Sequence, residues 1–308
     1  MNGEPVGVIN VLKPPGPTSH DVVARVRRML NFRKVGHAGT LDPGACGVLP
    51  ILVGRATKLM PFVLDHPKEY RAEMTLGIAT DTQDASGETV RVETGFAVKP
   101  SRLADVLYSF VGEIEQIPPM ASAVKSGGRR LYDLARRGET VEREPRSVRI
   151  YEIHVRAIWP EDAEALTAGS RVLIDVRCSR GTYIRTLCHD AGERLGCGAH
   201  MSFLVRTAVG PYTLSESITL EELEDAIRSG RTGDVLLPPD TAVRHLARVD
   251  VDPMGAARLR RGQAVPAMAN GLVPYSLVHV MEAGGGMVCV GRIEEADDLY
   301  LVKPVRVL

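Results

Sequence analysis

The sequence of 308 residues predicts an α+β fold in which helices flank a mixed, largely antiparallel sheet. Two segments, 68–76 and 171–178, alternate apolar and polar side chains, as strands buried on one face do. Two others, 22–30 and 103–111, carry apolar side chains at helical spacing. We therefore expect these strands and helices to form one domain over residues 1–245.

A second, smaller domain is predicted over residues 246–308. The dipeptide Pro238-Pro239 marks a boundary, and beyond it the chain changes to short strands and turns. About sixty residues of this kind make a compact β-rich module. We expect its strands at residues 258–265, 275–281, 287–292 and 300–307.

The N-terminal segment predicts a strand followed by a basic helix. Residues 6–12 form an apolar run that ends at Lys13-Pro14-Pro15-Gly16-Pro17. Thr18 and Ser19 then offer an N-cap for the helix over residues 22–30. The other face of that helix carries Arg25, Arg27 and Arg28. These arginines are either solvated or in contact with phosphates, and spacing alone does not distinguish the two.

Residues 34–50 concentrate backbone constraints around one carboxylate, with four glycines and two prolines in seventeen residues. Glycine permits positive φ and close backbone approach, and proline fixes φ. We therefore expect a rigid loop that holds Asp42 in one orientation, with His37 nearby. Taken alone, the stretch is better explained by a plain Asp-Pro turn.

The middle of the chain combines regular elements with one irregular insertion. In the strand over 68–76, Tyr70 points toward the core side, where it is either a packing residue or part of a site. A polar connection over 77–87 precedes a helix that begins at Pro100 and ends near Gly112. Residues 118–146 then lack periodicity, apart from one short basic helix after Leu131. They suggest a binding loop or a disordered insertion.

A strand-to-helix junction follows the predicted strands over 148–155 and 171–178. Residues 179–182 turn into Tyr183 and Arg185, and a helix then continues to Gly196. Such junctions often carry sites, although a structural arginine is as common there. Further along, a capping box over residues 219–222 opens a short acidic helix.

Charge is balanced overall but unevenly distributed. The chain has 38 basic and 38 acidic residues. Residues 11–37 carry six basic residues against one acid, residues 120–149 carry eight against four, and residues 219–240 carry two against six. This polarity either presents a basic groove to nucleic acid or reflects scattered, solvated charge.

Cysteine usage and hydropathy indicate a cytoplasmic protein. The five cysteines are odd in number and contain no C-x-x-C pair, which favours free thiols in a reducing compartment over disulfides or a zinc site. No signal peptide or run of ~20 apolar residues is apparent, so no membrane association is expected. Motifs for nucleotide binding, zinc proteases and serine hydrolases are absent.

Four motifs, in order, resemble those of the bacterial tRNA pseudouridine synthase B (TruB) family. They are Lys13 to Ser19, Gly36 to Pro43, Lys68-Glu69-Tyr70 and Ser179 to Arg185, and the tail Val302 to Arg306 is similar to the end of the family's PUA domain. The resemblance covers nearly the whole chain. It implies a pseudouridine synthase fold with a C-terminal PUA-like domain, and isomerisation of uridine 55 in the T loop of tRNA.

The resemblance also implies residue roles. Asp42 is the catalytic carboxylate, acting as a nucleophile or as a base, and Arg185 is its partner, expected to lower its pKa. The target base must leave the RNA stack, and His37 matches the residue that fills the gap. The pocket around the base is implied to contain Tyr70, Tyr183 and Leu204. No redox cofactor or metal is required.

Contacts with RNA are implied in two further places. The segment 118–146 corresponds to the family's thumb insertion, and we expect Arg129, Arg130, Arg136 and Arg137 to contact phosphates of the T arm. The C-terminal domain is expected to contact the acceptor end of tRNA. We expect a monomer that needs no guide RNA. The alternatives are an RNA-guided pseudouridine synthase and a noncatalytic tRNA-binding or folding factor on the same scaffold.

Overall fold

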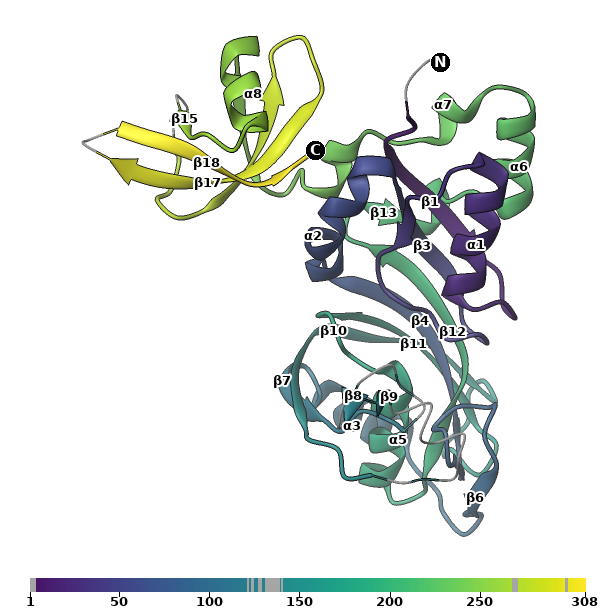
Figure 1. Cartoon of the computed structure of the whole chain (residues 1–308). Helices are drawn as coiled ribbons and strands as arrows, with labels where there is room; N and C mark the ends of the chain where they lie inside the picture. The colour runs from purple at the N-terminus through teal and green to yellow at the C-terminus, as the bar shows by residue number, and fades with distance from the viewer. Residues whose placement is uncertain are drawn as a thin grey trace.

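The computed structural model describes residues 4–120, 122, 125–126, 129–130, 139, 141–267, 271–296 and 299–308. Within this part of the chain, nine strands form one mixed sheet whose main path is β1-β3-β12-β4-β11-β10-β7, with β2 beside β3 and β13 beside β12 (Figure 1). The pairs along this sheet are antiparallel except β3 with β12, which is parallel. The expected α+β class is confirmed.

The strands of this sheet are, in chain order, β1 (Gly7–Lys13), β2 (Val35–His37), β3 (Cys46–Val53), β4 (Lys68–Leu76), β7 (Gly112–Gln116), β10 (Arg146–Trp159), β11 (Arg171–Cys178), β12 (Ala199–Val209) and β13 (Tyr212–Thr213). Its helices are α1 (Ser19–Leu30), η1 (Gly54–Leu59), α2 (Met60–Asp65), α3 (Pro100–Tyr108), α5 (Ile184–Leu195), η2 (Leu214–Glu216), α6 (Leu220–Arg228), α7 (Thr232–Val235) and η3 (Pro239–Ala242).

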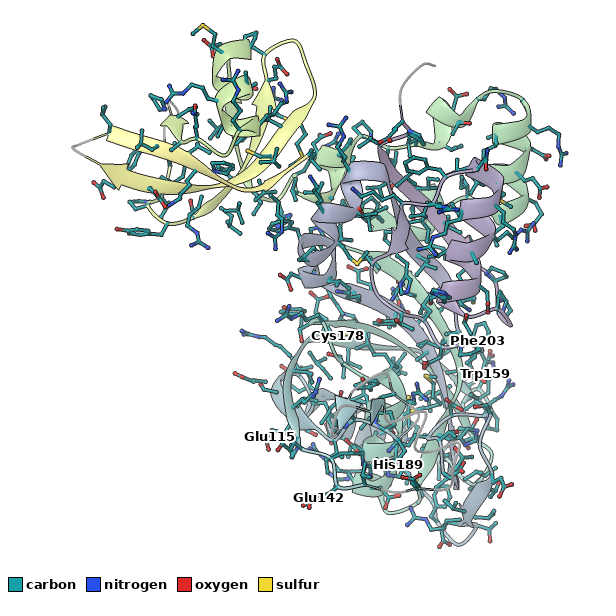
Figure 2. All side chains as sticks on the ribbon, viewed as in Figure 1. Glu115, Glu142, Trp159, Cys178, His189 and Phe203 are labelled. Atoms are coloured by element: carbon teal, nitrogen blue, oxygen red, sulfur yellow. The ribbon has the colours of Figure 1, made fainter. Side chains whose placement is uncertain are left out.

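The sheet has two halves with separate cores. In the first, α1 and α6 cover one face of β1 and β3, while η1 and α2 cover the other. In the second, α3 and α5 pack on one face of β4, β11 and β10. The halves join where β12 runs beside β3 for two residue pairs, Val205 with Cys46 and Arg206 with Gly47. Figure 2 adds the side chains and labels Trp159 of β10 and Phe203 of β12 on the second half.

Several helix boundaries follow from the capping residues that the sequence contains. At the start of α1, the Thr18 hydroxyl accepts a hydrogen bond from the Asp21 N–H, and the Asp21 carboxylate accepts one from the Thr18 N–H. The two bonds form a capping box. Thr219 and Glu222 form the same arrangement at α6. The α5 helix ends at Gly196, which adopts φ +79°. These expectations are confirmed.

Other boundaries differ from the prediction. The segment 77–87 includes a strand, because β5 (Ile78–Thr80) pairs with β6 (Thr89–Val92). The α3 helix ends at Tyr108 rather than near Gly112, where β7 begins with φ +116°. The long central strand β12 is not predicted as a whole, since its buried side chains do not alternate clearly with polar ones.

The C-terminal module contains five strands in the order β14-β16-β17-β18-β15. Its elements are β14 (Ala247–Val251), α8 (Pro253–Arg260), β15 (Val265–Pro266), β16 (Leu277–Glu282), β17 (Met287–Ala296) and β18 (Leu299–Val307). Three of the expected strands are present. The expected strand over 258–265 is wrong: most of that stretch is helix or turn, because the Asp252 side chain caps the Gly255 N–H at 2.6 Å and Pro253 begins α8.

The module packs on the first half of the main sheet. Val290, in β17, belongs to the same apolar cluster as Leu59 and Val243. In addition, the Lys58 ammonium donates a hydrogen bond to the Val307 carbonyl at 2.6 Å. The C-terminal strand is therefore attached directly to η1.

The insertion is described only in part. Two short strands, β8 (Lys125–Ser126) and β9 (Arg129–Arg130), pair with each other. The side chains of Arg129 and Arg130, the residues Arg136 and Arg137 and the expected basic helix lie outside the described residues.

The cysteines are not linked by disulfides. All five are free thiols, as predicted. In the part of the chain that the structure describes, no helix combines the length and apolar character needed to cross a membrane.

Candidate active site

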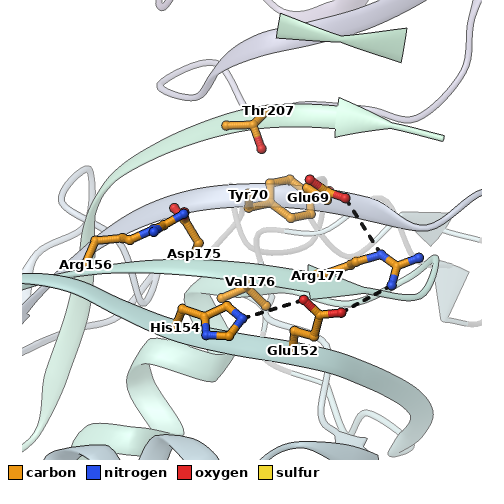
Figure 3. A pocket seen from close by; sticks show the side chains of 9 residues that line it. All are labelled: Glu69, Tyr70, Glu152, His154, Arg156, Asp175, Val176, Arg177 and Thr207. Carbon is orange, nitrogen blue, oxygen red and sulfur yellow. Dashed lines mark hydrogen bonds and ion pairs between the residues drawn. The ribbon is translucent and has the colours of Figure 1, made fainter. Parts of the chain in front are cut away.

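A small depression of about 160 Å³ lies on the sheet face opposite α5 (Figure 3). Its wall contains charged side chains that pair with one another, such as Arg177 with Glu152 at 3.4 Å. None of the charged residues that line it belongs to the predicted site. Among the described residues, no three His, Cys, Asp or Glu side chains gather closely enough to hold a metal ion.

The loop that carries Asp42 lies between β2 and β3, where the two halves of the sheet join, and the N-terminal motif holds it in place. The buried Lys13 ammonium donates hydrogen bonds to the carbonyls of Pro43 at 3.2 Å and Ala45 at 2.7 Å. The Ser19 hydroxyl donates to the Leu41 carbonyl and accepts from its N–H, at 3.0 and 2.8 Å. The first sequence motif therefore positions the second.

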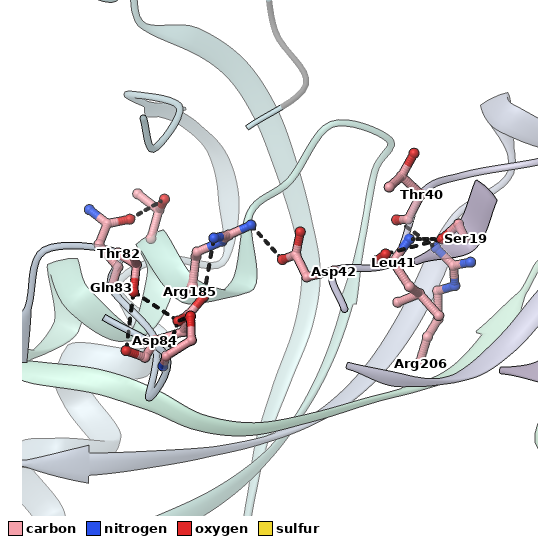
Figure 4. Close-up of polar contacts among 11 residues, drawn as sticks. Ser19, Thr40, Leu41, Asp42, Thr82, Gln83, Asp84, Arg185 and Arg206 are labelled. Atoms are coloured by element: carbon pink, nitrogen blue, oxygen red, sulfur yellow. Dashed lines mark hydrogen bonds and ion pairs between the residues drawn. The ribbon is translucent and has the colours of Figure 1, made fainter. Parts of the chain in front are cut away.

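Asp42 belongs to a three-residue ionic network (Figure 4). Arg185, at the start of α5, donates to Asp42 Oδ2 at 2.5 Å and to Asp84 Oδ2 at 3.1 Å. The Arg185 side chain is only 5% exposed, whereas Asp42 is 38% exposed. The guanidinium is thus enclosed, and the carboxylate that it orients remains accessible to a substrate.

Residues of its own turn, Thr82 and Ser86, hold the Asp84 side chain in place. Its Oδ1 atom accepts hydrogen bonds from the Thr82 hydroxyl at 2.8 Å and from the Ser86 N–H at 2.9 Å. Nearby, the Thr186 hydroxyl of α5 donates to the Gln83 side chain at 2.9 Å. The segment predicted to be a polar connection therefore fixes the second carboxylate on Arg185.

The pKa of Asp42 is raised above its ordinary value, chiefly by burial. Arg185 lowers the pKa of Asp42, Asp84 raises it through like charge, and Lys13 lowers it. Arg185 therefore lowers the pKa of Asp42, as expected, but burial and the Asp84 charge raise that pKa by more than Arg185 lowers it.

Tyr70 and Leu204 lie on neighbouring strands of the second half. Tyr70, in β4, is half-buried and pairs in register with Arg206 of β12. Burial raises the pKa of Tyr70, the Arg206 charge lowers it, and the Asp42 charge raises it, so the phenol lies within electrostatic reach of the carboxylate. Leu204 is 7% exposed and belongs to the apolar cluster that also contains Leu41 of the Asp42 loop.

Tyr183 and His37 lie at the edges of this region. Tyr183 precedes α5, and its backbone exchanges two hydrogen bonds with the Gln116 side chain, at 2.9 and 3.2 Å. His37 ends β2, before the Asp42 loop. Burial and the Arg206 charge lower the pKa of His37, so its imidazole is neutral at pH 7.

The structure brings Asp42, Arg185 and Tyr70 together from segments far apart in sequence. It adds three residues to which the sequence had assigned no role in this site: Lys13, Asp84 and Arg206. Lys13 lies in a recognised motif, and its apolar surroundings are the only further signal. In the sequence, Asp84 looks like an ordinary turn residue. Its contact with Arg185 cannot be seen there, because the two residues are 101 positions apart.

Comparison with known proteins identifies the family. Residues 27–184 match the model of the N-terminal domain of the TruB family of pseudouridylate synthases. The chain belongs to this family. Residues 185–244 match the tRNA pseudouridylate synthase B C-terminal domain. A TruB-family member is an isomerase that makes pseudouridine.

Relatives cover most of the chain. The tRNA pseudouridine synthase B of Alkaliphilus oremlandii is 46% identical over 284 residues, covering 92% of this chain and 89% of the relative. That of Symbiobacterium thermophilum is 51% identical, covering 84% and 82%. Among solved structures, a Cbf5-Nop10-Gar1 complex contains a chain with TM-score 0.74 and 34% identity, covering 98% of this chain and 84% of that one.

A second solved structure, an H/ACA RNP bound to a substrate RNA containing 2′-deoxyuridine, gives TM-score 0.73 at 31% identity, covering 98% of this chain and 84% of that one. The TruB fold therefore extends over almost the entire chain, including the C-terminal module.

Proposed function

We propose that this protein isomerises uridine 55 in the T loop of tRNA to pseudouridine, with Asp42 as the catalytic carboxylate. The relatives that span most of the chain are named tRNA pseudouridine synthase B, which supports tRNA as the substrate. The position in the T loop follows from the four ordered motifs. The observation that carries the assignment of Asp42 is its pairing with the enclosed Arg185 at 2.5 Å, beside Tyr70.

The reaction rearranges one nucleoside without a net change in composition. The N1–C1′ bond breaks, the uracil turns while it stays bound, and a C5–C1′ bond forms. The hydrogen on C5 leaves as a proton, and N1 ends with a proton. Asp42 starts this sequence, either by attack at C1′ or by removal of a ribose proton, and both routes need its ionised form.

Arg185 orients that carboxylate and opposes the effect of burial on its pKa. Because the pKa of Asp42 is raised, activity falls as the pH is lowered through the pKa of Asp42 in the complex.

The remaining side chains receive the extruded base. Tyr70 stacks on the uracil and lies where its hydroxyl reaches the C5 side, while Tyr183 and Leu204 complete the wall. His37 lies at the entrance of the Asp42 loop, and its neutral ring can occupy the gap that the base leaves in the RNA. A half-buried tyrosine beside an accessible carboxylate is the geometry that this requires.

The wider RNA contacts come from two regions. Segment 118–146 acts as the thumb that clamps the T arm, with Arg129, Arg130, Arg136 and Arg137 on phosphates. The C-terminal module, residues 246–308, is a PUA-like domain that contacts the acceptor end. The enzyme acts as a monomer and without a guide RNA.

The decisive test uses unmodified tRNA labelled with tritium at uridine C5. The wild type should release the label without added guide RNA, and Asp42→Asn should lose this activity by about 10²- to 10⁴-fold. Asp175→Asn is the matched control, since this aspartate is also paired with arginine but lies on the opposite sheet face. Release that depends on a guide RNA would favour the RNA-guided alternative, and tight binding without release would favour a noncatalytic factor.

A second test addresses the thumb. Replacing Arg129, Arg130, Arg136 and Arg137 with Ala should weaken tRNA binding and flatten the plot of log Kd against log salt by roughly one unit for each phosphate that the variant no longer neutralises. The matched control removes four arginines from the exposed sheet face: Arg71, Arg156, Arg171 and Arg177. An equal change of slope in both variants would contradict the assignment.

A further inference from the structure

Arg206 is a charged side chain enclosed beneath the proposed site. It is 1% exposed and is among the largest fully buried side chains of the protein. Its Nε atom donates to the Val48 carbonyl at 2.8 Å, and its Nη2 atom donates to the Gly39 carbonyl at 2.9 Å. Its Nη1 atom lies 3.4 Å from the Thr40 carbonyl. Tyr70 pairs with Arg206 in register across β4 and β12, and the guanidinium lowers the pKa of the phenol by its charge and by a side-chain hydrogen bond.

These partners come from three different parts of the site. Gly39 and Thr40 precede Asp42 in its loop, Val48 lies in β3 beyond that loop, and Tyr70 lies in β4. Among the described residues, the hydrogen-bond partners of Arg206 are carbonyls and a phenol, with no carboxylate. A buried charge is costly unless such hydrogen bonds satisfy it, so a neutral packing residue would be the simpler choice for structure alone.

The backbone around Arg206 is arranged for close approach. At the junction of the two sheet halves, a Cβ atom added to Gly47 would lie 2.2 Å from the Arg206 carbonyl. One added to Gly39, which has φ +93°, would lie 3.3 Å from Arg206 Nη1. Glycine at position 39 therefore lets its carbonyl face the guanidinium without contact between side chains.

We propose that Arg206 is a positioning residue for the isomerisation, which fixes the Tyr70 hydroxyl relative to the loop that carries Asp42. A planar guanidinium with donors in a rigid fork can bind the loop carbonyls and the phenol at once, whereas an ammonium cannot keep that geometry. The proposal rests on the proposed function, because it requires Asp42 and Tyr70 to act on the same nucleotide.

This role predicts a defect in chemistry rather than in binding. Misplacing a catalytic group by about an ångström costs on the order of 10²-fold in rate. In single-turnover tritium release with excess enzyme, Arg206→Lys should lower the rate constant by about 10- to 100-fold. Its Kd for tRNA should stay within about threefold of the wild type. A rate within twofold of the wild type in a folded Arg206→Lys protein would overturn the proposal.

A double-mutant cycle separates positioning from a general loss of structure. Tyr70→Phe removes the phenol oxygen that contacts Arg206. If the two side chains act together, the loss in the double variant falls short of the product of the single losses by more than about threefold. A double variant within threefold of that product shows independent action and overturns the proposal.

Gly39→Ala tests the same contact if Arg206→Lys does not fold, because its added Cβ displaces the guanidinium. It should give the same loss of rate and the same shortfall in the Tyr70→Phe background. Gly112→Ala is the matched control: Gly112 has φ +116° and open space around its Cβ position, so it introduces backbone strain without touching Arg206. Equal losses of rate in the two alanine variants would overturn the proposal.

The outcome also distinguishes this inference from the function on which it depends. If Asp42→Asn keeps full activity, the proposed function fails. If Asp42→Asn is inactive while Arg206→Lys is normal, only the role of Arg206 fails.

Discussion

Asp42 and Asp175 are both paired with arginine, but they lie in different parts of the main sheet. Asp42 is in the loop between β2 and β3, where the two halves join, and Asp175 is in β11, on the exposed face of the second half. Asp175 accepts hydrogen bonds from Arg71 at 2.7 and 2.9 Å and from Arg156 at 2.5 Å, on the exposed face. Asp42 has one arginine, Arg185, and shares it with Asp84. Among the described residues, the ion pairs of the first network join two cations to one acid, and those of the second join two acids to one cation.

The balance of charge and burial, rather than the presence of an ion pair, separates the two sites. Hydrogen bonds from Arg71, together with those from Arg156, lower the pKa of Asp175. Burial and Asp84 raise the pKa of Asp42 despite a contact of 2.5 Å with Arg185. An aspartate of the first kind is a stabilising surface contact, and one of the second kind has the raised pKa that is common at functional sites.

Among the variants of residues around Asp42, the largest effect on activity is expected from Arg185→Gln. Without the cation, the pKa of Asp42 rises further and the carboxylate loses its orientation. Tritium release at pH 7 should fall by about 10²- to 10³-fold, and the acid limb of the residual pH–rate profile should move to higher pH. Arg71→Gln on the exposed face is the control and should leave the profile unchanged. An unshifted limb in Arg185→Gln would show that its charge does not act on Asp42.

Asp84→Asn should give a smaller loss and the opposite shift. Removing this carboxylate removes a like charge, so the pKa of Asp42 falls and the acid limb moves to lower pH. Arg185 also loses its ion pair with Asp84, so we expect the plateau rate to fall by about tenfold, measured by single-turnover tritium release. If the acid limb of the pH–rate profile of Asp84→Asn moved to higher pH, this would contradict the conclusion that the Asp84 charge raises the pKa of Asp42.

Asp175→Asn should affect stability but not catalysis. Since the pKa of Asp175 is lowered by folding, its contribution to stability is present above the unfolded-state pKa and is lost as the pH falls through the folded-state pKa. At pH 7 the variant should be less stable by about 0.5 to 1 kcal/mol in urea unfolding. The difference should vanish once the pH lies below the folded-state pKa of Asp175, and a difference that persists there would assign the loss to packing instead.

Asp42→Asn should have the smallest and least intuitive effect on stability. A carboxylate whose pKa is raised by folding is less favourable when ionised in the folded protein, so asparagine should raise the Tm at pH 7 by up to about 2 °C. The gain should disappear as the pH is lowered through the pKa of Asp42, where the wild-type side chain also becomes neutral. A lower Tm for the variant at pH 7 would indicate that the pair with Arg185 outweighs burial.

Much of the fold could be predicted because the relevant signals are local. The strand over 68–76 and the helix over 184–195 carry clear periodicity and, for the helix, a terminal glycine. The strand β12 could not be predicted in this way, because both of its faces are largely buried and its side chains do not alternate. The start of helix α8 is set by its cap Asp252 and by Pro253, and not by a periodic run of apolar residues.

The residues of the candidate site also differ in whether their signals are local in the sequence. Asp42, Tyr70 and Arg185 could be proposed from motifs, since each lies in a short characteristic string. Asp84 and Arg206 could not, because their significance lies in contacts with residues more than a hundred positions away. Turn chemistry alone explains Asp84 in the sequence, and an arginine in a strand predicts an exposed side chain.

The sequence by itself predicted the family, many of the elements and Asp42 as the candidate carboxylate, because periodicity, caps and rigid loop residues act over a few positions. Only the tertiary structure decided the protonation balance of that carboxylate and the residues that surround it. Burial and charge depend on which distant segments pack together, and the parallel contact of β3 with β12 brings Arg206 beneath the Asp42 loop. The identity of Asp42 is encoded locally, while its chemistry depends on Arg185, Asp84 and Lys13 around it.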